Sequence, residues 1–81
     1  MKSLPEAFGK AVRMLREQTG VSQEAFAYSA KIDRAFMSRV ERGKSNISLA
    51  TVDRIALALE ISLDELFAEV ERQRSGAGLS T

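Results

Sequence analysis

Apolar residues recur every three or four positions along most of the chain, which is the spacing of one face of an α-helix. The first such set is Phe8, Ala11, Val12 and Leu15. Alternating patterns typical of strands are almost absent. The pattern therefore predicts an all-α protein with five helices, at roughly residues 4–19, 23–30, 34–42, 49–59 and 63–72. Because residues 55–59 are apolar on nearly every side, we expect the fourth helix to be central.

Short capping motifs mark where four of these helices begin. Each motif is a Ser or Asp with one apolar residue before it and another apolar residue four positions after it. The side-chain oxygen accepts a backbone amide, while the apolar pair fixes the direction of entry. The motifs are Val21-Ser22 with Phe26, Ile32-Asp33 with Met37, Ile47-Ser48 with Val52 and Ile61-Ser62 with Leu66. Residues 3–6 and 62–65 also form capping boxes, and Gly20 and Gly43 suit the left-handed position that ends a helix.

The C-terminal residues and the composition narrow the class of protein. Residues 73–81 are rich in Gly and Ser, so we expect a single domain over residues 1–72 and a disordered tail. The 81-residue chain has no Cys and no His, which excludes disulfides, zinc fingers and catalysis by thiolate or imidazole. No apolar run approaches the ~20 residues of a membrane span, and residues 1–5 are not followed by the apolar stretch typical of a signal peptide. We therefore expect a cytoplasmic protein without cofactor or metal that is not an enzyme.

Charge is distributed unevenly along the chain. A net charge of +1 argues by itself against a nucleic-acid-binding protein, which usually carries a clear basic excess. Residues 1–44, however, hold nine Lys or Arg against five acids, a net of +4, and residues 45–81 hold three against six, a net of −3. Two interpretations of the first half fit: an ordinary solvated surface, or a face that binds an anionic partner.

The predicted helix over residues 34–42 distinguishes these interpretations. On a helical wheel, Phe36, Met37 and Val40 share an arc that faces the core, with Glu41 at the margin. The opposite arc, which has no acid, carries Arg34, Ala35, Ser38, Arg39 and Arg42. An ordinary surface helix mixes charges, whereas small residues and arginine forks suit close approach to a nucleic acid. The arc favours DNA binding, although three arginines on one arc can also arise by chance.

Four motifs carry a resemblance to a known family. They are Ser22-Gln23-Glu24-Ala25-Phe26-Ala27, Ile32-Asp33-Arg34, Met37-Ser38-Arg39-Val40-Glu41-Arg42-Gly43 and Ile61-Ser62-Leu63-Asp64-Glu65-Leu66-Phe67. From about residue 8 to residue 70 the chain resembles the Xre/Cro-type, lambda-repressor-like helix-turn-helix family, which includes phage repressors and restriction–modification controller proteins. The resemblance implies a compact five-helix domain with the helix-turn-helix at the second and third helices. It also implies a homodimeric transcriptional regulator that places helix 34–42 in the major groove of a pseudo-palindromic DNA operator.

The resemblance assigns roles to individual residues. Its base-reading positions correspond to Arg34, Ala35 and Arg39. We expect contacts with the DNA backbone from Ser22, Gln23, Lys31, Ser38, Arg42, Lys44, Ser45 and Asn46. The resemblance also implies an ion pair between Arg16 and Glu41, with Arg13 as an alternative partner.

Two positions depart from the family pattern. Lys31 follows the second helix and Glu60 follows the fourth, where the family commonly has Gly. If the left-handed conformation is retained, each non-Gly residue costs about 1 kcal/mol.

The acidic second half holds a candidate surface for assembly. Its apolar residues exceed what one short helix can bury internally, so we expect part of them to form a two-fold interface; the alternative is that all belong to the core. These residues are Leu57, Leu59, Ile61, Leu63, Phe67 and Val70. A different functional class also fits, the antitoxin or protein-interaction module of a toxin–antitoxin pair. We expect no small-molecule effector, because no effector domain follows residue 72.

Overall fold

The computed structural model describes residues 1–76, and within them the chain forms five helices and no strand. The helices are α1 (Leu4–Thr19), α2 (Gln23–Ala30), α3 (Arg34–Glu41), α4 (Leu49–Leu59) and α5 (Leu63–Ser75). The prediction of an all-α protein is confirmed. None of these helices is both long and apolar enough to cross a membrane.

The last helix is longer than the sequence pattern predicts. α5 continues to Ser75 and ends at Gly76, which adopts the left-handed conformation with φ 74°. Residues 73–75, predicted as tail, are therefore helical, while residues 77–81 lie outside the described part of the chain. The apolar periodicity stops at Val70, but polar contacts extend the helix. The carboxylate of Glu69 accepts hydrogen bonds from Arg72 Nη2 at 2.6 Å and Gln73 Nε2 at 2.8 Å.

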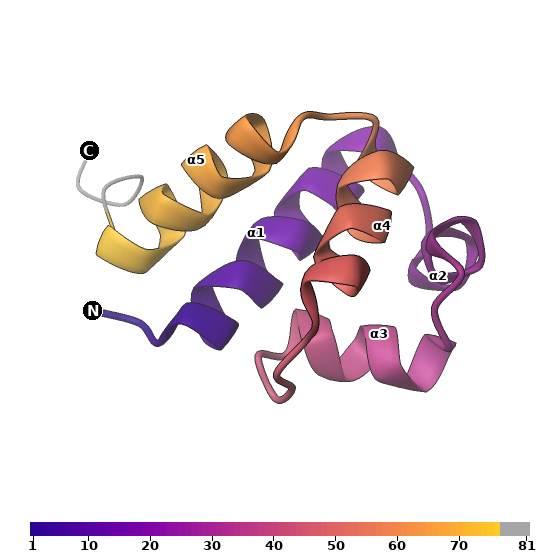
Figure 1. The fold of residues 1–81 in the computed structure, drawn as a ribbon, viewed down its shortest axis with the longest axis horizontal. Helices are drawn as coiled ribbons and strands as arrows, with labels where there is room; N and C mark the ends of the chain where they lie inside the picture. Colours follow the sequence, from indigo (N-terminus) through magenta and orange to yellow (C-terminus); the bar gives the residue numbers. More distant parts are fainter. Residues whose placement is uncertain (77–81) are drawn as a thin grey trace.

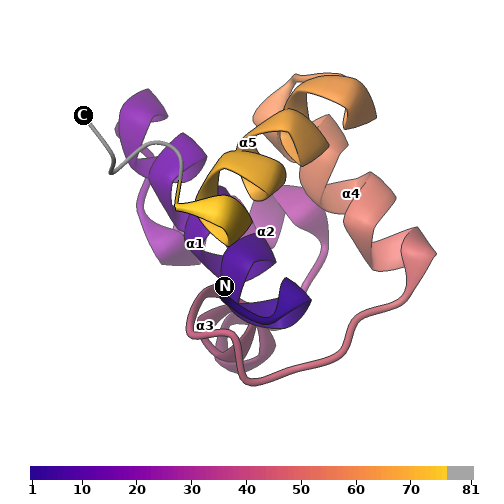
Figure 2. The same ribbon diagram turned by 90° about the vertical axis from the view of Figure 1, so that its left-hand side faces the viewer.

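The central helix is α1, and the prediction that the fourth helix is central is wrong. α1 packs most extensively on α5, which runs antiparallel above it, and also contacts α3 on its other side and α4 (Figure 1). Figure 2 shows the same order, with α3 below α1 on the side away from α5. α4 packs mainly on α2 and leaves Leu49 84% and Leu57 67% exposed. An apolar run on a helix covers all of its sides, and only one side of α4 meets the core.

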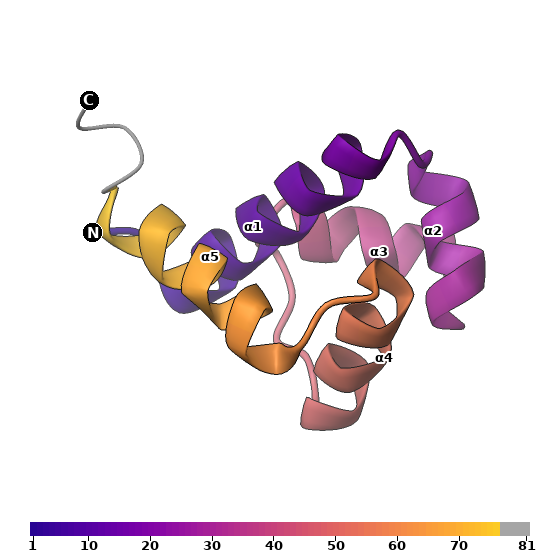
Figure 3. The same cartoon turned by 90° about the horizontal axis from the view of Figure 1, so that it is seen from above.

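One continuous core joins the five helices. Its largest fully buried side chains are Val12, Met37, Ile55, Leu66 and Val70. The two ends of the described chain meet at one end of the molecule, where the amide of Lys2 donates to the carbonyl of Arg74 at 3.3 Å. α2 lies at the opposite end, as Figure 3 shows. α2 thus lies far from the termini, whereas the end of α3 packs on the first half of α1, where Gly9 faces the carbonyls of Val40 and Glu41.

Two helices end in a left-handed residue other than Gly. Lys31 ends α2 and Glu60 ends α4, each with φ 59°. The amide of Lys31 donates to the carbonyls of Ala27 and Tyr28, which completes the last turn of α2. The left-handed conformation is therefore retained at both positions where the family commonly has Gly.

Candidate nucleic-acid interface

α3 presents one basic face to solvent. The helix begins at Asp33, whose carboxylate accepts hydrogen bonds from the amides of Ala35 at 3.0 Å and Phe36 at 3.3 Å. It buries Met37, Val40 and Glu41 against the rest of the protein. Its exposed residues are Arg34, Ala35 and Arg39. Within Arg34–Glu41 the only acid, Glu41, is buried, so the exposed face of α3 carries positive charge alone.

Phe36 contributes to this face, although the sequence pattern did not predict that contribution. The helical wheel assigns Phe36 to the core, but its ring is half-buried at the edge of the core. The guanidinium carbon of Arg39 lies 5.5 Å from the centroid of that ring, within the range of a cation–π contact. The i, i+3 spacing of Phe36 and Arg39 is the feature of the sequence that could have predicted this contact. Phe36 restricts the directions that Arg39 can take without neutralising its charge.

The start of α2 completes the basic face. Gln23, Arg34, Ala35 and Ser38 line one shallow hollow between the beginning of α2 and α3. Ser22 caps α2, since its hydroxyl oxygen accepts the amide of Ala25 at 3.1 Å. The amides of the first turn of a helix attract anions, because they have no partner within the helix. The fold thus places the start of α2, where the helix amides can bind a phosphate, next to the basic face of α3.

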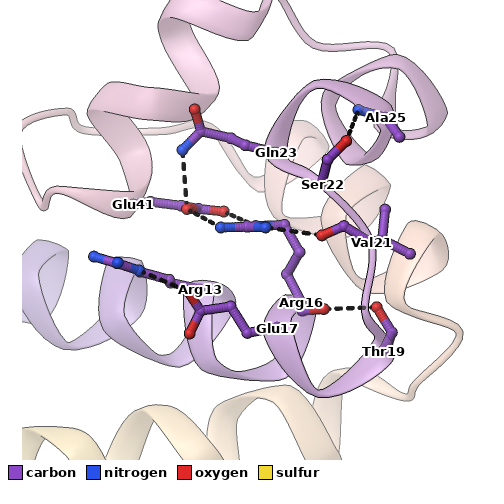
Figure 4. A network of polar contacts seen from close by, with 9 residues as sticks. All are labelled: Arg13, Arg16, Glu17, Thr19, Val21, Ser22, Gln23, Ala25 and Glu41. Atoms are coloured by element: carbon purple, nitrogen blue, oxygen red, sulfur yellow. Dashed lines mark hydrogen bonds and ion pairs between the residues drawn. The ribbon is translucent and has the colours of Figure 1, made fainter.

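Behind this face lies a nearly buried ion pair (Figure 4). Arg16 of α1 donates to Glu41 of α3 through Nε at 2.7 Å and Nη2 at 3.0 Å. The side chains are 10% and 3% exposed, respectively. The hydrogen bonds to Glu41 raise the pKa of the Arg16 guanidinium above its ordinary value. The predicted Arg16–Glu41 pair is present. The alternative partner, Arg13, pairs with Glu17 instead, with 3.1 Å between Arg13 Nε and Glu17 Oε2.

Two further polar contacts complete the network around this pair. Arg16 Nη1 donates to the carbonyl of Val21 at 2.8 Å, in the turn before α2. Gln23 Nε2 donates to Glu41 Oε1 at 3.0 Å. The network therefore connects α1, α3 and the start of α2 through one carboxylate.

The other residues expected at the DNA backbone lie in two places. Lys44 and Asn46 are exposed and Ser45 is half-buried in the segment between α3 and α4, close to Arg42, whose Nε donates to the carbonyl of Ser38 at 3.2 Å. Lys31 is exposed at the turn between α2 and α3. It lines a separate hollow between α2 and α4, together with Ser29, Arg54 and Leu57.

Burial removes some of the residues predicted for the dimer interface from the surface. Leu59 and Val70 face inward and belong to the core, and Ile61 is half-buried. Leu57 is exposed, but it lines the hollow beside Lys31. Leu63 and Phe67 are the two predicted residues that remain exposed on α5.

A different apolar surface adjoins Phe67. We call it the apolar groove, and it is lined by Leu4, Phe8, Ile47, Leu49 and Phe67. The rings of Phe8 and Phe67, both in its lining, have their centroids 6.1 Å apart. Leu4 and Leu49, which the sequence analysis did not select, are exposed at its edges. Ser45 and Asn46 also line the groove, so it borders the segment that follows α3.

Comparison with known proteins places the chain among DNA-binding regulators. A model of the helix-turn-helix domain matches residues 7–70. The control protein C.MunI of Mycoplasma sp is 39% identical over 74 residues, which cover 90% of this chain and 100% of that protein. The structure is similar to that of the restriction–modification controller C.AhdI from Aeromonas hydrophila, with a TM-score of 0.74 and 40% identity. That match covers 76% of this chain and 94% of C.AhdI.

A further similar structure contains DNA. The controller C.Esp1396I bound to a 25 base pair operator site has a TM-score of 0.82 and 25% identity, over 90% of this chain and 96% of that one. The same controller also forms a tetramer in complex with its natural 35 base-pair operator.

Proposed function

The chain belongs to the helix-turn-helix domain family, and from this premise we propose that it regulates transcription by binding double-stranded DNA in a sequence-specific manner. The observation that carries the proposal is the exposed face of α3, which holds arginines and small residues but no acid and lies beside the start of α2. Its relatives are bacterial and phage regulators, so we place its action in the cytoplasm.

Each part of the face has a role in this proposal. α3 enters the major groove, where Arg34 and Arg39 bind base edges, most favourably guanine O6 and N7. Ala35 offers its methyl group to a thymine methyl. The DNA backbone is held by groups within α3 and on both sides of it, which position the helix without reading sequence. These groups are Ser22, Gln23, Lys31, Ser38, Arg42, Lys44, Ser45 and Asn46.

The proposed active form is a homodimer on a pseudo-palindromic operator. A single small domain contacts one half-site, and two domains related by two-fold symmetry read two half-sites about one helical turn apart. The apolar groove and the exposed Leu63, one turn before Phe67 on α5, offer the surface for the second copy. The C.Esp1396I tetramer in complex with its operator supports an assembly of more than one chain on DNA.

The replacement Arg39→Ala tests the base-reading role. The operator is first selected from a random DNA pool, and binding is then titrated on the selected site and on unrelated DNA. We expect affinity for the selected site to fall about 5- to 150-fold, equivalent to the ~1–3 kcal/mol of a bidentate base contact, with a much smaller loss on unrelated DNA. Arg13→Ala, which removes the same charge from an exposed site on α1, is the matched control. Equal losses of Arg39→Ala on both DNAs would contradict the proposal.

A further inference from the structure

We propose that Glu41 is a positioning residue for DNA binding, which orients the side-chain amide of Gln23 before DNA arrives. This inference rests on the proposed DNA-binding function. It concerns the hydrogen bond from Gln23 Nε2 to Glu41 Oε1, 3.0 Å long, which joins the start of α2 to the end of α3. The group that Gln23 then offers is a single N–H, and its ligand is a phosphate of the DNA backbone.

The orientation of the Gln23 amide follows from charge. An ionised carboxylate only accepts hydrogen bonds, whereas an amide has a donor end and an acceptor end. The reverse orientation would place the carbonyl oxygen of Gln23 against the carboxylate oxygen of Glu41, and two acceptors would repel each other. Figure 4 shows the nitrogen toward Glu41 and the carbonyl oxygen pointing away. Chemistry therefore selects one of the two amide orientations.

Glu41 is itself held rigidly. Its side chain is 3% exposed, and Arg16 contributes two hydrogen bonds to it, one on each oxygen. Arg16 is fixed in turn by the carbonyl of Val21, in the turn that leads into α2. The carboxylate thus cannot follow Gln23 if the amide rotates, and it acts as a fixed acceptor.

The side chain of Gln23 lies at the proposed DNA face. Gln23 is half-buried and lines the same hollow as Arg34, Ala35 and Ser38. One N–H of Gln23 is committed to Glu41, so one N–H remains for an acceptor outside the protein. The unpaired amides at the start of α2 favour an anion at the same place. A phosphate oxygen meets both requirements, because it is an anion and accepts hydrogen bonds.

Fixing the amide lowers the cost of binding. A glutamine side chain is rich in rotamers, and immobilising such a side chain on binding costs affinity. Here the folded protein has already restricted Gln23 through Glu41. The ion pair between Arg16 and Glu41 would thereby influence DNA affinity although neither residue contacts DNA.

The mobility of the Gln23 amide tests the first step in the free protein. Nitrogen-15 relaxation of side-chain amides should give an order parameter above about 0.8 for Gln23. The exposed Gln18 of α1 is the internal control, with a value below about 0.6. Equal mobility of the two amides would overturn the inference whatever the protein does with DNA.

A double-mutant cycle on the selected operator tests the second step. We expect Gln23→Met, which keeps the length and the ion pair but removes the donor, to lower affinity about tenfold. Glu41→Gln should lower affinity about three- to tenfold in the wild-type background. In the Gln23→Met background the same substitution should lower affinity less than about twofold. Equal losses from Glu41→Gln in both backgrounds would show a general structural role and overturn the inference.

Two controls keep these outcomes distinct. Circular dichroism establishes that each variant is folded at the titration temperature. If Glu41→Gln unfolds, the inference is tested by the relaxation of the wild-type Gln23 amide and by the affinity of Gln23→Met. If the wild-type protein selects no sequence and binds no duplex, the proposed function fails and the inference falls with it. If the wild type binds but Gln23→Met binds equally well, the inference and the backbone role of Gln23 are overturned, while the proposed DNA-binding function of the chain stands.

Discussion

At Gly9 the lack of a side chain allows α1 to lie directly on the end of α3. A β-carbon on Gly9 would overlap the carbonyl oxygen of Val40 and lie 2.9 Å from that of Glu41. Both neighbours are backbone atoms, which cannot move without displacing the helix. The position of α3 against α1 depends on this contact, and so does the Arg16–Glu41 pair, about two turns further along α1.

Replacing Gly9 by Ala should therefore destabilise the protein, although Ala favours helix formation more than Gly does. We expect the free energy of unfolding, measured by urea denaturation, to fall by about 3 kcal/mol because the added methyl group forces α1 and α3 apart. Lys10→Ala, at an exposed position of the same helix, should change it by less than about 0.5 kcal/mol. Indistinguishable unfolding midpoints for the two variants would show that the helices separate at no cost.

At the scale of single elements, the helix ends are built from local interactions. Every helix of the described chain begins at a Ser or Asp whose side chain accepts an amide of the first turn. The capping boxes at Ser3–Glu6 and Ser62–Glu65 are both complete. These contacts join residues two or three positions apart, which is why the sequence alone predicts them.

The left-handed end of α4 provides a test of backbone strain. Glu60→Gly should raise the free energy of unfolding by up to about 1 kcal/mol, because Gly adopts φ 59° without the steric cost of a β-carbon. The greater freedom of Gly in the unfolded chain reduces this gain. Glu60→Ala separates the backbone effect from the loss of the carboxylate, since Ala retains the β-carbon and should show no gain. A gain of equal size in both variants would assign the effect to charge.

The capping box of α1 should make the stability depend on pH. The hydrogen bond from the Ser3 amide to the Glu6 carboxylate, 3.1 Å long, lowers the pKa of Glu6 below its ordinary value of 4.5. A lowered pKa in the folded state means that the stabilisation is present above pH 4.5 and is lost as the pH falls through the folded-state pKa.

We therefore expect the wild type to melt at a higher temperature than Glu6→Gln at pH 7, and the difference to shrink as the pH falls below 4.5. Glutamine keeps the acceptor of the capping box but does not titrate, so the comparison isolates the charge. A difference in melting temperature that stays constant between pH 7 and pH 3 would refute the role of the Glu6 charge.

At the level of the whole molecule, the basic face and the apolar groove are two separate surfaces. The basic face combines α3 with the start of α2, whereas the apolar groove lies between α1, α4 and α5. The segment after α3 connects them, because Ser45 and Asn46 line the groove. A second copy bound at the groove would therefore lie close to the proposed DNA, as a dimer on two adjacent half-sites requires.

The groove can be distinguished from other exposed apolar residues by two matched variants. Leu49→Lys places a charge at the edge of the groove, and Leu57→Lys places the same charge at an exposed residue in the hollow between α2 and α4. In sedimentation at micromolar concentration we expect the wild type and Leu57→Lys to have about twice the 8.9 kDa of one chain, and Leu49→Lys to be monomeric. A monomeric wild type, or loss of the dimer only in Leu57→Lys, would contradict this surface.

Local sequence patterns are enough to predict five helices, their starting residues and the exposed arginines of α3. Each of these depends on residues within two turns of one another, and the repeat of the helix places them. Arg34 and Arg39 were therefore identified as exposed without any tertiary information. The Arg16–Glu41 pair was predicted from the resemblance, because it joins residues 25 positions apart that no local pattern connects.

Which neighbour each helix face meets cannot be predicted from local patterns and follows from the packing of the helices. Periodicity marks Leu49, Leu57 and Leu59 equally as apolar, yet Leu59 faces the core, Leu49 borders the groove and Leu57 lies elsewhere on the surface. The same holds for Gln23, whose hydrogen bond to Glu41 depends on how α2 and α3 pack. The physical reason is that burial is a property of pairs of surfaces, and the pairing follows from the packing of all five helices at once.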